Sequence, residues 1–472
     1  MNKSLITLAV TALLAGCSLA PTYERPAAPI PSAAQTWPQG DAYKPAAQPT
    51  ATKEAYDIAW RDFIADEQLK QLVELALANN RDLRVSILNI EKARAQYGVQ
   101  RAGQVPHVNA TVSQTANRVP DNSSPTGDGY ITRQYSAGLG IPAFELDFFG
   151  RVKNLSEAAL QQYLGTAEAR RSQQISLVAE VTNAWLTLAA DQERLRLAQD
   201  TLKSQQITYE LSKRRFEAGA TSGLDMYEAQ TSVESARNDV AVYTAQVAAD
   251  QNALALLAGA AVPAELLPQG PLGPVTQVAD LPEGVPSTVL QRRPDVLSAE
   301  RTLQAANADI GVARAAFFPS ISLTASAGSA SGALSGLFKA GSGAWTFIPQ
   351  LTLPIFAGGA NQANLDIAKT NRDIAVAQYE KAIQSAFREV ADALAQRGTI
   401  DERVASQTAL VEASGKSYRI HEQRYQKGAE SYLNALVSQR TLYAAQQSLI
   451  TARLAKASNQ VTLYKVLGGG WQ

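Results

Sequence analysis

The side chains best able to do chemistry in this chain are one cysteine and two histidines. A single cysteine, Cys17, cannot form an intrachain disulfide, and His107 and His421 are too isolated to build a Cys/His zinc cluster. The sequence contains no G-x-S-x-G nucleophile motif, no G-x-x-x-x-G-K-[ST] phosphate loop and no G-x-G-x-x-G opening a helix. The carboxylates fall at helical spacings on polar faces, which favours solvated surface. We therefore expect ordinary histidines, no metal, no cofactor and no enzymatic activity.

The N-terminus gives Cys17 a different chemistry. Lys3 precedes an apolar stretch, Leu5–Ala15, and this pattern is typical of a bacterial secretion signal. Gly16 and Cys17 follow, as in a bacterial lipoprotein box, so we expect cleavage between Gly16 and Cys17 and a covalent lipid (palmitate) on Cys17. Ser18, rather than aspartate, follows the cysteine, and in this the chain resembles lipoproteins that Gram-negative bacteria sort to the outer membrane. The alternative is a buried free thiol at Cys17.

Composition excludes several classes of protein. The chain has 472 residues, of which 43 are Lys or Arg and 43 are Asp or Glu, so it lacks the basic excess of a nucleic-acid binder. Its mean hydropathy is −0.15. No stretch reaches the roughly 20 apolar residues that a spanning helix needs, which excludes a bundle of membrane helices.

The chain contains an internal duplication. The segment 79–112 matches 292–325, with Asp82 on Asp295 and Pro106 on Pro319. The segment 215–225 matches 424–434, with Gly219-Ala220 on Gly428-Ala429. Two blocks in the same order, separated by nearly one period, predict two structural repeats.

Each repeat is predicted to contain helix, strand, strand, helix and helix. Apolar and polar residues alternate around 108–116, 135–141, 320–327 and 345–353, which indicates strands with one apolar face. Loops rich in Gly, Ser, Asp or Pro separate the strands of each pair. From Thr166 to Ala218 there are 53 residues without Gly or Pro. In that run and in the last helix, apolar residues recur every seven positions, which predicts long supercoiled helices packed between neighbours in a tube wall.

Four strands cannot close a barrel, since about eight is the practical minimum. Two chains would supply eight strands and three would supply twelve. A lipid anchor, a shared barrel and long helices together favour a membrane protein of the α+β class that forms a channel-tunnel.

Several motifs carry a family resemblance: FELDFFGR (144–151), LQRRPDV (290–296), ARAAFFPSISLTA (313–325), NNRDL (79–83) and LGGGW (467–471). With them the chain resembles the outer-membrane efflux factors of the TolC class, most of all the lipoprotein branch typified by OprM. The resemblance implies a homotrimer with a 12-stranded outer-membrane barrel, a periplasmic α-helical barrel and an equatorial belt. It also implies a periplasmic adaptor and an inner-membrane pump of the resistance–nodulation–division class as partners.

The expected division of the chain follows from the repeats and the resemblance. It comprises a signal peptide (1–16), a lipid-anchored extension (17–55), a first repeat (56–262, with a hairpin at 107–147 and long helices at 152–258), a Pro-rich equatorial linker (263–286), a second repeat (287–467, with a hairpin at 319–356 and long helices at 360–467) and a tail (468–472).

The resemblance places a periplasmic gate at two helical turns, which match Gly219–Ser222 and Gly428–Ser431. Tyr425, Gly428, Leu433 and Arg440 match near relatives, whereas Asn434 and Val437 stand where members often carry aspartate. A cation-binding carboxylate ring is therefore not expected, and Glu430 is the first candidate if one exists. We expect closure by Leu433 and by inter-helix hydrogen bonds, with Arg440 pairing to carboxylates or carbonyls of neighbouring helices. The alternative for Leu433 is ordinary coiled-coil packing.

The resulting expectation is passive export of small toxic compounds and antibiotics across the outer membrane of a Gram-negative bacterium. A duct for metal ions or for type I protein secretion would have the same fold. A periplasmic scaffold without transport would not need the alternating strands.

Overall fold

The computed structural model describes residues 18–29, 37–44, 55–125, 127–276 and 290–471. Its α-helices are α2 (Trp60–Phe63), α3 (Glu67–Asn79), α4 (Arg81–Ala102), α5 (Arg151–Glu217), α6 (Gly223–Ala258), α8 (Pro294–Ala315), α9 (Ala360–Gln426) and α10 (Tyr432–Val466). Its strands are β1 (Asn109–Val119), β2 (Tyr130–Leu146), β3 (Ser320–Ser331) and β4 (Gly343–Thr352). Four single turns of 3-10 helix complete the described elements: η1 (Ala55–Asp57), η2 (Asp121–Ser123), η3 (Ala264–Leu266) and η4 (Leu334–Gly336).

The two repeats contain matching elements. Helices α5 and α9 both have 67 residues, α4 and α8 both have 22, and α6 and α10 have 36 and 35. At about 1.5 Å per residue, α5 and α9 are each roughly 100 Å long. None of the described helices is both long and apolar enough to cross a membrane.

The chain divides into two compact units that do not coincide with the repeats. The first unit comprises the described parts of 1–27, 89–167 and 298–380, and it holds the sheet. The second comprises those of 28–88, 168–297 and 381–472. Both repeats contribute to both units.

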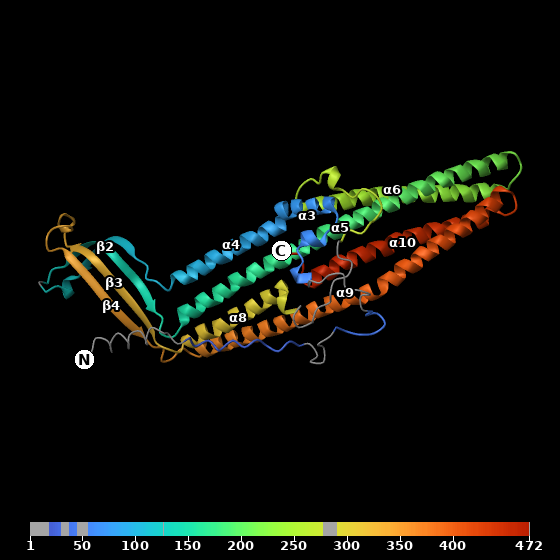
Figure 1. The fold of residues 1–472 in the computed structure, drawn as a ribbon. Helices are drawn as coiled ribbons and strands as arrows, with labels where there is room; N and C mark the ends of the chain where they lie inside the picture. The colour runs from blue at the N-terminus through green and yellow to red at the C-terminus, as the bar shows by residue number, and fades with distance from the viewer. Residues whose placement is uncertain (1–17, 30–36, 45–54, 126, 277–289, 472) are drawn as a thin grey trace. The chain divides into compact units, whose positions relative to one another are not determined.

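The sheet of the first unit is antiparallel, with strand order β1-β2-β3-β4 (Figure 1). Between Ile141 and Phe144 the register of β2 against β3 shifts by one residue, which makes a β-bulge at Pro142. The Thr324 hydroxyl donates a hydrogen bond of 2.8 Å to the Pro142 carbonyl and so satisfies a group that the ladder leaves free. Because of the bulge, Ile141 and Phe144 lie on the same face of the sheet.

One face of this sheet is apolar along most of its length. Partners across the strands share a face, and the rows run Leu146–Ile321–Leu351, Phe144–Leu323–Pro349, Ile141–Ala325–Phe347 and Leu139–Ala327–Trp345. The opposite face carries mainly small polar side chains, and its Ser113 and Ser136 hydroxyls are 2.7 Å apart. The alternation in the sequence therefore reports two chemically distinct faces.

The core of the second unit is built by residues distant in the sequence. The rings of Phe63 and Tyr464 stack with centroids 3.9 Å apart, and the Tyr464 hydroxyl donates a 2.6 Å hydrogen bond to the Ile58 carbonyl. The Trp185 indole N–H donates to the carbonyl of Leu266, at the start of the predicted Pro-rich linker, over 3.0 Å. Residues 277–286 of that linker lie outside the described residues.

The heptad positions of the long helices are largely buried in this unit. Val181 and Leu188 of α5 are fully buried. Leu436, Ile450 and Tyr464 of α10 are almost fully buried. The seven-residue period thus identifies the packed edge of each helix.

Candidate functional site

The two helical turns that join α5 to α6 and α9 to α10 have the same backbone geometry. In the first, the Gly219 N–H donates to the Phe216 carbonyl and the Ala220 N–H to the Arg215 carbonyl, over 2.9 and 2.8 Å. In the second, Gly428 and Ala429 repeat these bonds to the two equivalent carbonyls over 3.0 and 2.9 Å. This pair of bonds defines a Schellman C-cap, which needs a residue with positive φ. Gly219 and Gly428 have φ of 70° and 73°, so glycine is required by conformation.

Tyr425 lies in a small core below these turns. Its ring packs at 52° on that of Tyr432, with centroids 5.3 Å apart, and Ala229, Ala435 and Leu436 complete the buried cluster. The hydroxyls of Tyr425 and Ser212 are 3.3 Å apart, and the Arg215 guanidinium lies 5.0 Å from the ring centroid of Tyr425. Tyr425 therefore ties the α9–α10 turn to α5 from a buried position.

The Glu430 carboxylate in the α9–α10 turn has three polar partners within its own chain. The Asn434 amide donates to it over 2.8 Å, His421 Nδ1 lies 3.0 Å away, and Arg424 Nε lies 3.4 Å away. The hydrogen bonds from His421 and Asn434 lower the pKa of Glu430. This carboxylate is ionised at neutral pH and already has partners within its own chain.

The first turn contains the same contact with the chemical roles exchanged. Glu430 and Asn434 correspond in the repeat to Thr221 and Asp225. There the Thr221 hydroxyl donates to the Asp225 carboxylate. Each turn thus holds one carboxylate in an i, i+4 hydrogen bond. The carboxylate is the first residue of the pair in the second turn (Glu430) and the second residue in the first turn (Asp225).

Leu433 and Val437 face away from the packed core of their own chain, with 49% and 53% of their surface exposed. Together with Asn434, they line a groove between α9 and α10 that is otherwise formed by small residues and His421. Tyr432 and Leu436 are the residues of this turn that pack inward. Within one chain, Leu433 is therefore half-exposed, whereas Tyr432 and Leu436 are buried.

Arg440 is exposed on α10, near the Asp239 and Tyr443 side chains. The Tyr443 hydroxyl donates to the Asp239 carboxylate over 3.0 Å. Within the described part of its own chain, the Arg440 guanidinium forms no ion pair and no hydrogen bond. The partner expected for Arg440 is therefore not found among the described residues of its own chain.

Gly16 and Cys17 lie outside the described residues, but the segment that follows them is held in the first unit. The Ser18 hydroxyl donates to Asn154 over 2.8 Å, and Arg314 donates to the Leu19 carbonyl over 3.0 Å. Further along, Arg25 forms a bidentate ion pair with the buried Glu300 at 2.8 and 2.9 Å. Sequence patterns did not identify this attachment, because its partners lie hundreds of residues apart.

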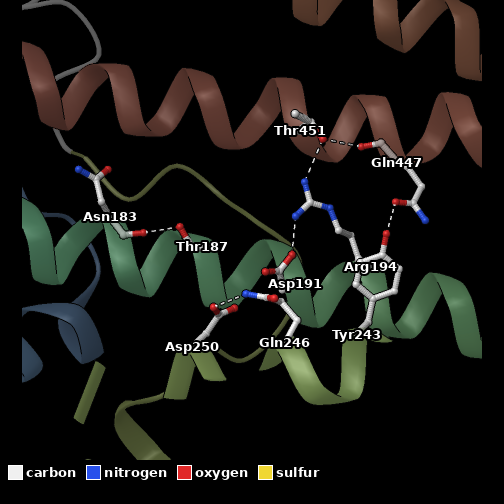
Figure 2. A network of polar contacts seen from close by, with 9 residues as sticks. All are labelled: Asn183, Thr187, Asp191, Arg194, Tyr243, Gln246, Asp250, Gln447 and Thr451. Carbon is white, nitrogen blue, oxygen red and sulfur yellow. Dashed lines mark hydrogen bonds and ion pairs between the residues drawn. The ribbon is translucent and has the colours of Figure 1, made fainter. Parts of the chain in front are cut away.

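A polar network inside the second unit corrects one expectation from the sequence (Figure 2). Asp191 was expected on solvated surface, but it is 4% exposed and pairs with Arg194, which also donates to Thr451 of α10 over 2.9 Å. Burial and a hydrogen bond with Asp191 raise the pKa of Asp250 to about 6. Gln246 donates to the same carboxyl over 2.9 Å. Helical spacing alone does not reveal this network, because its members come from three helices.

His421 makes a contact that sequence reasoning did not identify. It was expected to be an ordinary side chain, and its Nδ1 lies 3.0 Å from the Glu430 carboxylate across the α9–α10 turn. The duplication contains a weak signal for it, since His421 aligns with the buried Ser212 of the first repeat.

Comparison with known proteins defines the class. The model of the family described as outer membrane efflux protein matches residues 72–260 and again 285–469, one match for each repeat. The chain belongs to this family, and it is an outer-membrane efflux protein.

Individual relatives cover the whole chain. It is 51% identical over its full length to the probable efflux pump outer membrane protein TtgC of Pseudomonas putida, of which 96% is covered. It is 44% identical to outer membrane protein OprJ of Pseudomonas aeruginosa, over 98% of this chain and 95% of the relative. Among solved structures, a membrane protein from Pseudomonas aeruginosa is 43% identical with a TM-score of 0.88, over 96% of this chain and 98% of that chain. The open state of the Neisseria gonorrhoeae MtrE outer membrane channel is 37% identical with a TM-score of 0.85, over 97% and 99%.

Proposed function

We propose that this chain is the outer-membrane channel of a tripartite efflux system and passively exports small toxic organic compounds, including antibiotics. The observation that supports this most is the full-length similarity to relatives named for antibiotic and toluene efflux, over 100% of this chain. Those names favour organic compounds over metal ions or a secreted protein as the exported class. A periplasmic adaptor and an inner-membrane pump of the resistance–nodulation–division class would be the partners.

The proposed assembly is a homotrimer with a 12-stranded barrel. Within the described residues, β1 and β4 each pair on one side only, so the sheet has two open edges. Open edges in lipid leave backbone groups unsatisfied, which makes closure with other copies necessary. Three copies would pair β1 of one protomer with β4 of the next and leave a wet lumen, whereas eight strands would fill with side chains.

The proposed gate is the ring of α9–α10 turns around the three-fold axis. Exposed Leu433 would supply an apolar constriction, and Arg440 would find its partner on a neighbouring protomer. Asn434 and Val437 leave the ring without added carboxylates, and the negative charge of Glu430 is paired with Arg424 of its own chain. The channel would therefore rest closed without binding cations.

The proposed anchor is a lipid on Cys17 after removal of residues 1–16. The bonds of Ser18, Leu19 and Arg25 support it, because they fix the segment directly after Cys17 on the first unit.

Transport is tested in the native host by deleting the gene and restoring it on a plasmid. The deletion should raise accumulation of a fluorescent organic pump substrate, and the intact chain should reverse it, with the empty plasmid as control. Restored metal tolerance without restored efflux of the organic substrate would instead indicate a metal-ion duct. No effect on either would contradict a role in export.

A further inference from the structure

The charged residues of the sheet are few and unevenly placed. Among the residues of the four strands, only Arg118, Arg133 and Glu145 are charged. Glu145 lies on the polar face and is paired with Arg151. Both arginines lie on the other face, since Arg133 pairs with Ala116 and Arg118 with Ile131, in the same alternation as Val112 and Leu139.

This placement is opposite to what solvation alone favours. The polar face would give an arginine water on every side, yet Asn117 and Gln134 occupy the adjacent positions there. Both arginines are exposed, and within the described residues neither guanidinium has an ion pair or a hydrogen bond. The nearby Asp121 carboxylate instead accepts the Gly129 N–H over 2.8 Å.

The two arginines lie just beyond the apolar band. Along β2 the apolar face runs outward from Leu146 through Leu139 to Tyr135 and then Arg133. One apolar residue, Ile131, follows Arg133 on this face and pairs with Arg118 across the strands. The strand path from Leu146 to Arg133, tilted by about 40° at about 3.4 Å per residue, gives roughly 30 Å of height. The apolar band of an outer-membrane barrel is about 25 Å tall and ends in aromatic residues. An aromatic residue followed by arginine is the order expected at the far membrane surface.

We propose that Arg118 and Arg133 form a binding site for the phosphate groups of a phosphorylated glycolipid, lipid A, in the outer leaflet. The proposal rests on the proposed placement of the sheet in the outer membrane. The two side chains are diagonal neighbours on adjacent strands, which brings both guanidinium groups within reach of one headgroup. Guanidinium groups bind phosphate oxygens in bidentate fashion, and the apolar side chains below them contact the acyl chains. The lipid-facing position excludes the lumen and its cargo as the ligand.

The test uses the purified full chain in detergent and native mass spectrometry to measure retained lipid A. The probes are bisphosphorylated lipid A, lipid A freed of its phosphates, and inorganic phosphate as a competitor. The neutral variant carries Arg118→Gln and Arg133→Gln. The matched control moves each charge to the polar face, as Arg118→Gln with Asn117→Arg and Arg133→Gln with Gln134→Arg.

We expect the neutral and the face-exchanged variants to bind bisphosphorylated lipid A at least tenfold more weakly than the unmodified chain. Arg118→Lys with Arg133→Lys should bind more tightly than the neutral variant and less tightly than the unmodified chain, since lysine keeps the charge but loses the bidentate contact. This variant separates loss of charge from misfolding. Phosphate-free lipid should bind all forms alike. Unchanged binding by the face-exchanged variant, equal loss with phosphate-free lipid, or full displacement by millimolar inorganic phosphate would each overturn the site. Efflux measured in parallel tests the proposed function separately, because the lumen face is unaltered in the neutral variant.

Discussion

Placing an arginine at Ala325 should destabilise the protein far more than placing one at the next residue, Ser326. Ala325 lies on the apolar face between Ile141 and Phe347, while Ser326 lies on the polar face beside Thr346. Both are small residues of the interior strand β3, so the two variants differ mainly in which face receives the charge.

Depth on the apolar face sets the expected size of the effect. Rows two residues apart are roughly 5 Å apart in height, for a strand tilted by about 40°. Counted from the Leu351 row, the Ala325 row is the third and lies near the middle of a band about 25 Å tall. We therefore expect Ala325→Arg to cost about 2–4 kcal/mol per chain, and Leu351→Arg, near the lower edge, about 0–1 kcal/mol.

The assay is urea unfolding of protein refolded in lipid vesicles, together with the fraction that remains assembled on unheated gels. Ser326→Arg should stay close to the unmodified protein in both. A larger loss for Ser326→Arg than for Ala325→Arg would mean that the assignment of the two faces is reversed. Equal losses for Ala325→Arg and Leu351→Arg would refute the assigned depth.

Four further outcomes follow from other parts of the structure. Because the pKa of Asp250 is raised to about 6, folding binds a proton between about pH 4 and pH 6, and stability falls as pH rises through that window. Asp250→Asn should therefore increase the free energy of unfolding at pH 7.5 by about 1–2 kcal/mol, seen as a higher unfolding temperature, and this gain should disappear at pH 4. Gly428→Ala should cost about 1–2 kcal/mol because of its φ of 73°, whereas Gly415→Ala inside α9 should stabilise, as circular dichroism melts would show. Val437→Asp should increase single-channel conductance and cation capture, since like charges about 6 Å apart repel by roughly 3 kcal/mol at an effective dielectric of about 20; block of the unmodified channel by micromolar trivalent cation would contradict this view of the gate. Mass spectrometry of the mature N-terminal peptide should find acylated Cys17, and an unmodified Cys17 or cleavage elsewhere would refute the anchor.

The strands could be predicted from the sequence because each has one apolar and one polar face. The alternation identified β2 only as far as Ile141, since the bulge at Pro142 inserts one residue and exchanges the parity of everything after it. Nor does the alternation give the depth of Leu323 and Leu351 along the apolar face. Depth requires the register across strands, which a single-strand pattern does not contain.

The first long helix was predicted to begin at residue 152, and α5 begins at Arg151. The Gly/Pro-free run begins only at Thr166, because α5 passes through Gly165. A Cβ at Gly165 would lie 3.3 Å from the Arg301 Cβ of α8, and the Ser298 hydroxyl donates to the Gly165 carbonyl over 3.1 Å. Close packing between helices therefore explains a glycine that helix propensity alone disfavours inside a helix.

The helix turns were predictable because the duplication repeats their Gly-Ala pair, and only glycine suits the cap. The bonding of Glu430 was not, because His421 reaches it across a turn. Asp191 and Asp250 come from two different helices, and their burial depends on packing that charge patterns do not encode.

The central claim is that three copies of this chain enclose one continuous water-filled duct with a closed tip. Single-channel recording of the purified protein in planar bilayers tests it most directly, with the assembled mass measured on the same sample. We predict a trimer that gives small current steps, and larger steps for Leu433→Ala, because that variant removes an apolar side chain from the proposed constriction. A monomer or dimer, or the absence of current from both the unmodified protein and Leu433→Ala, would contradict the channel.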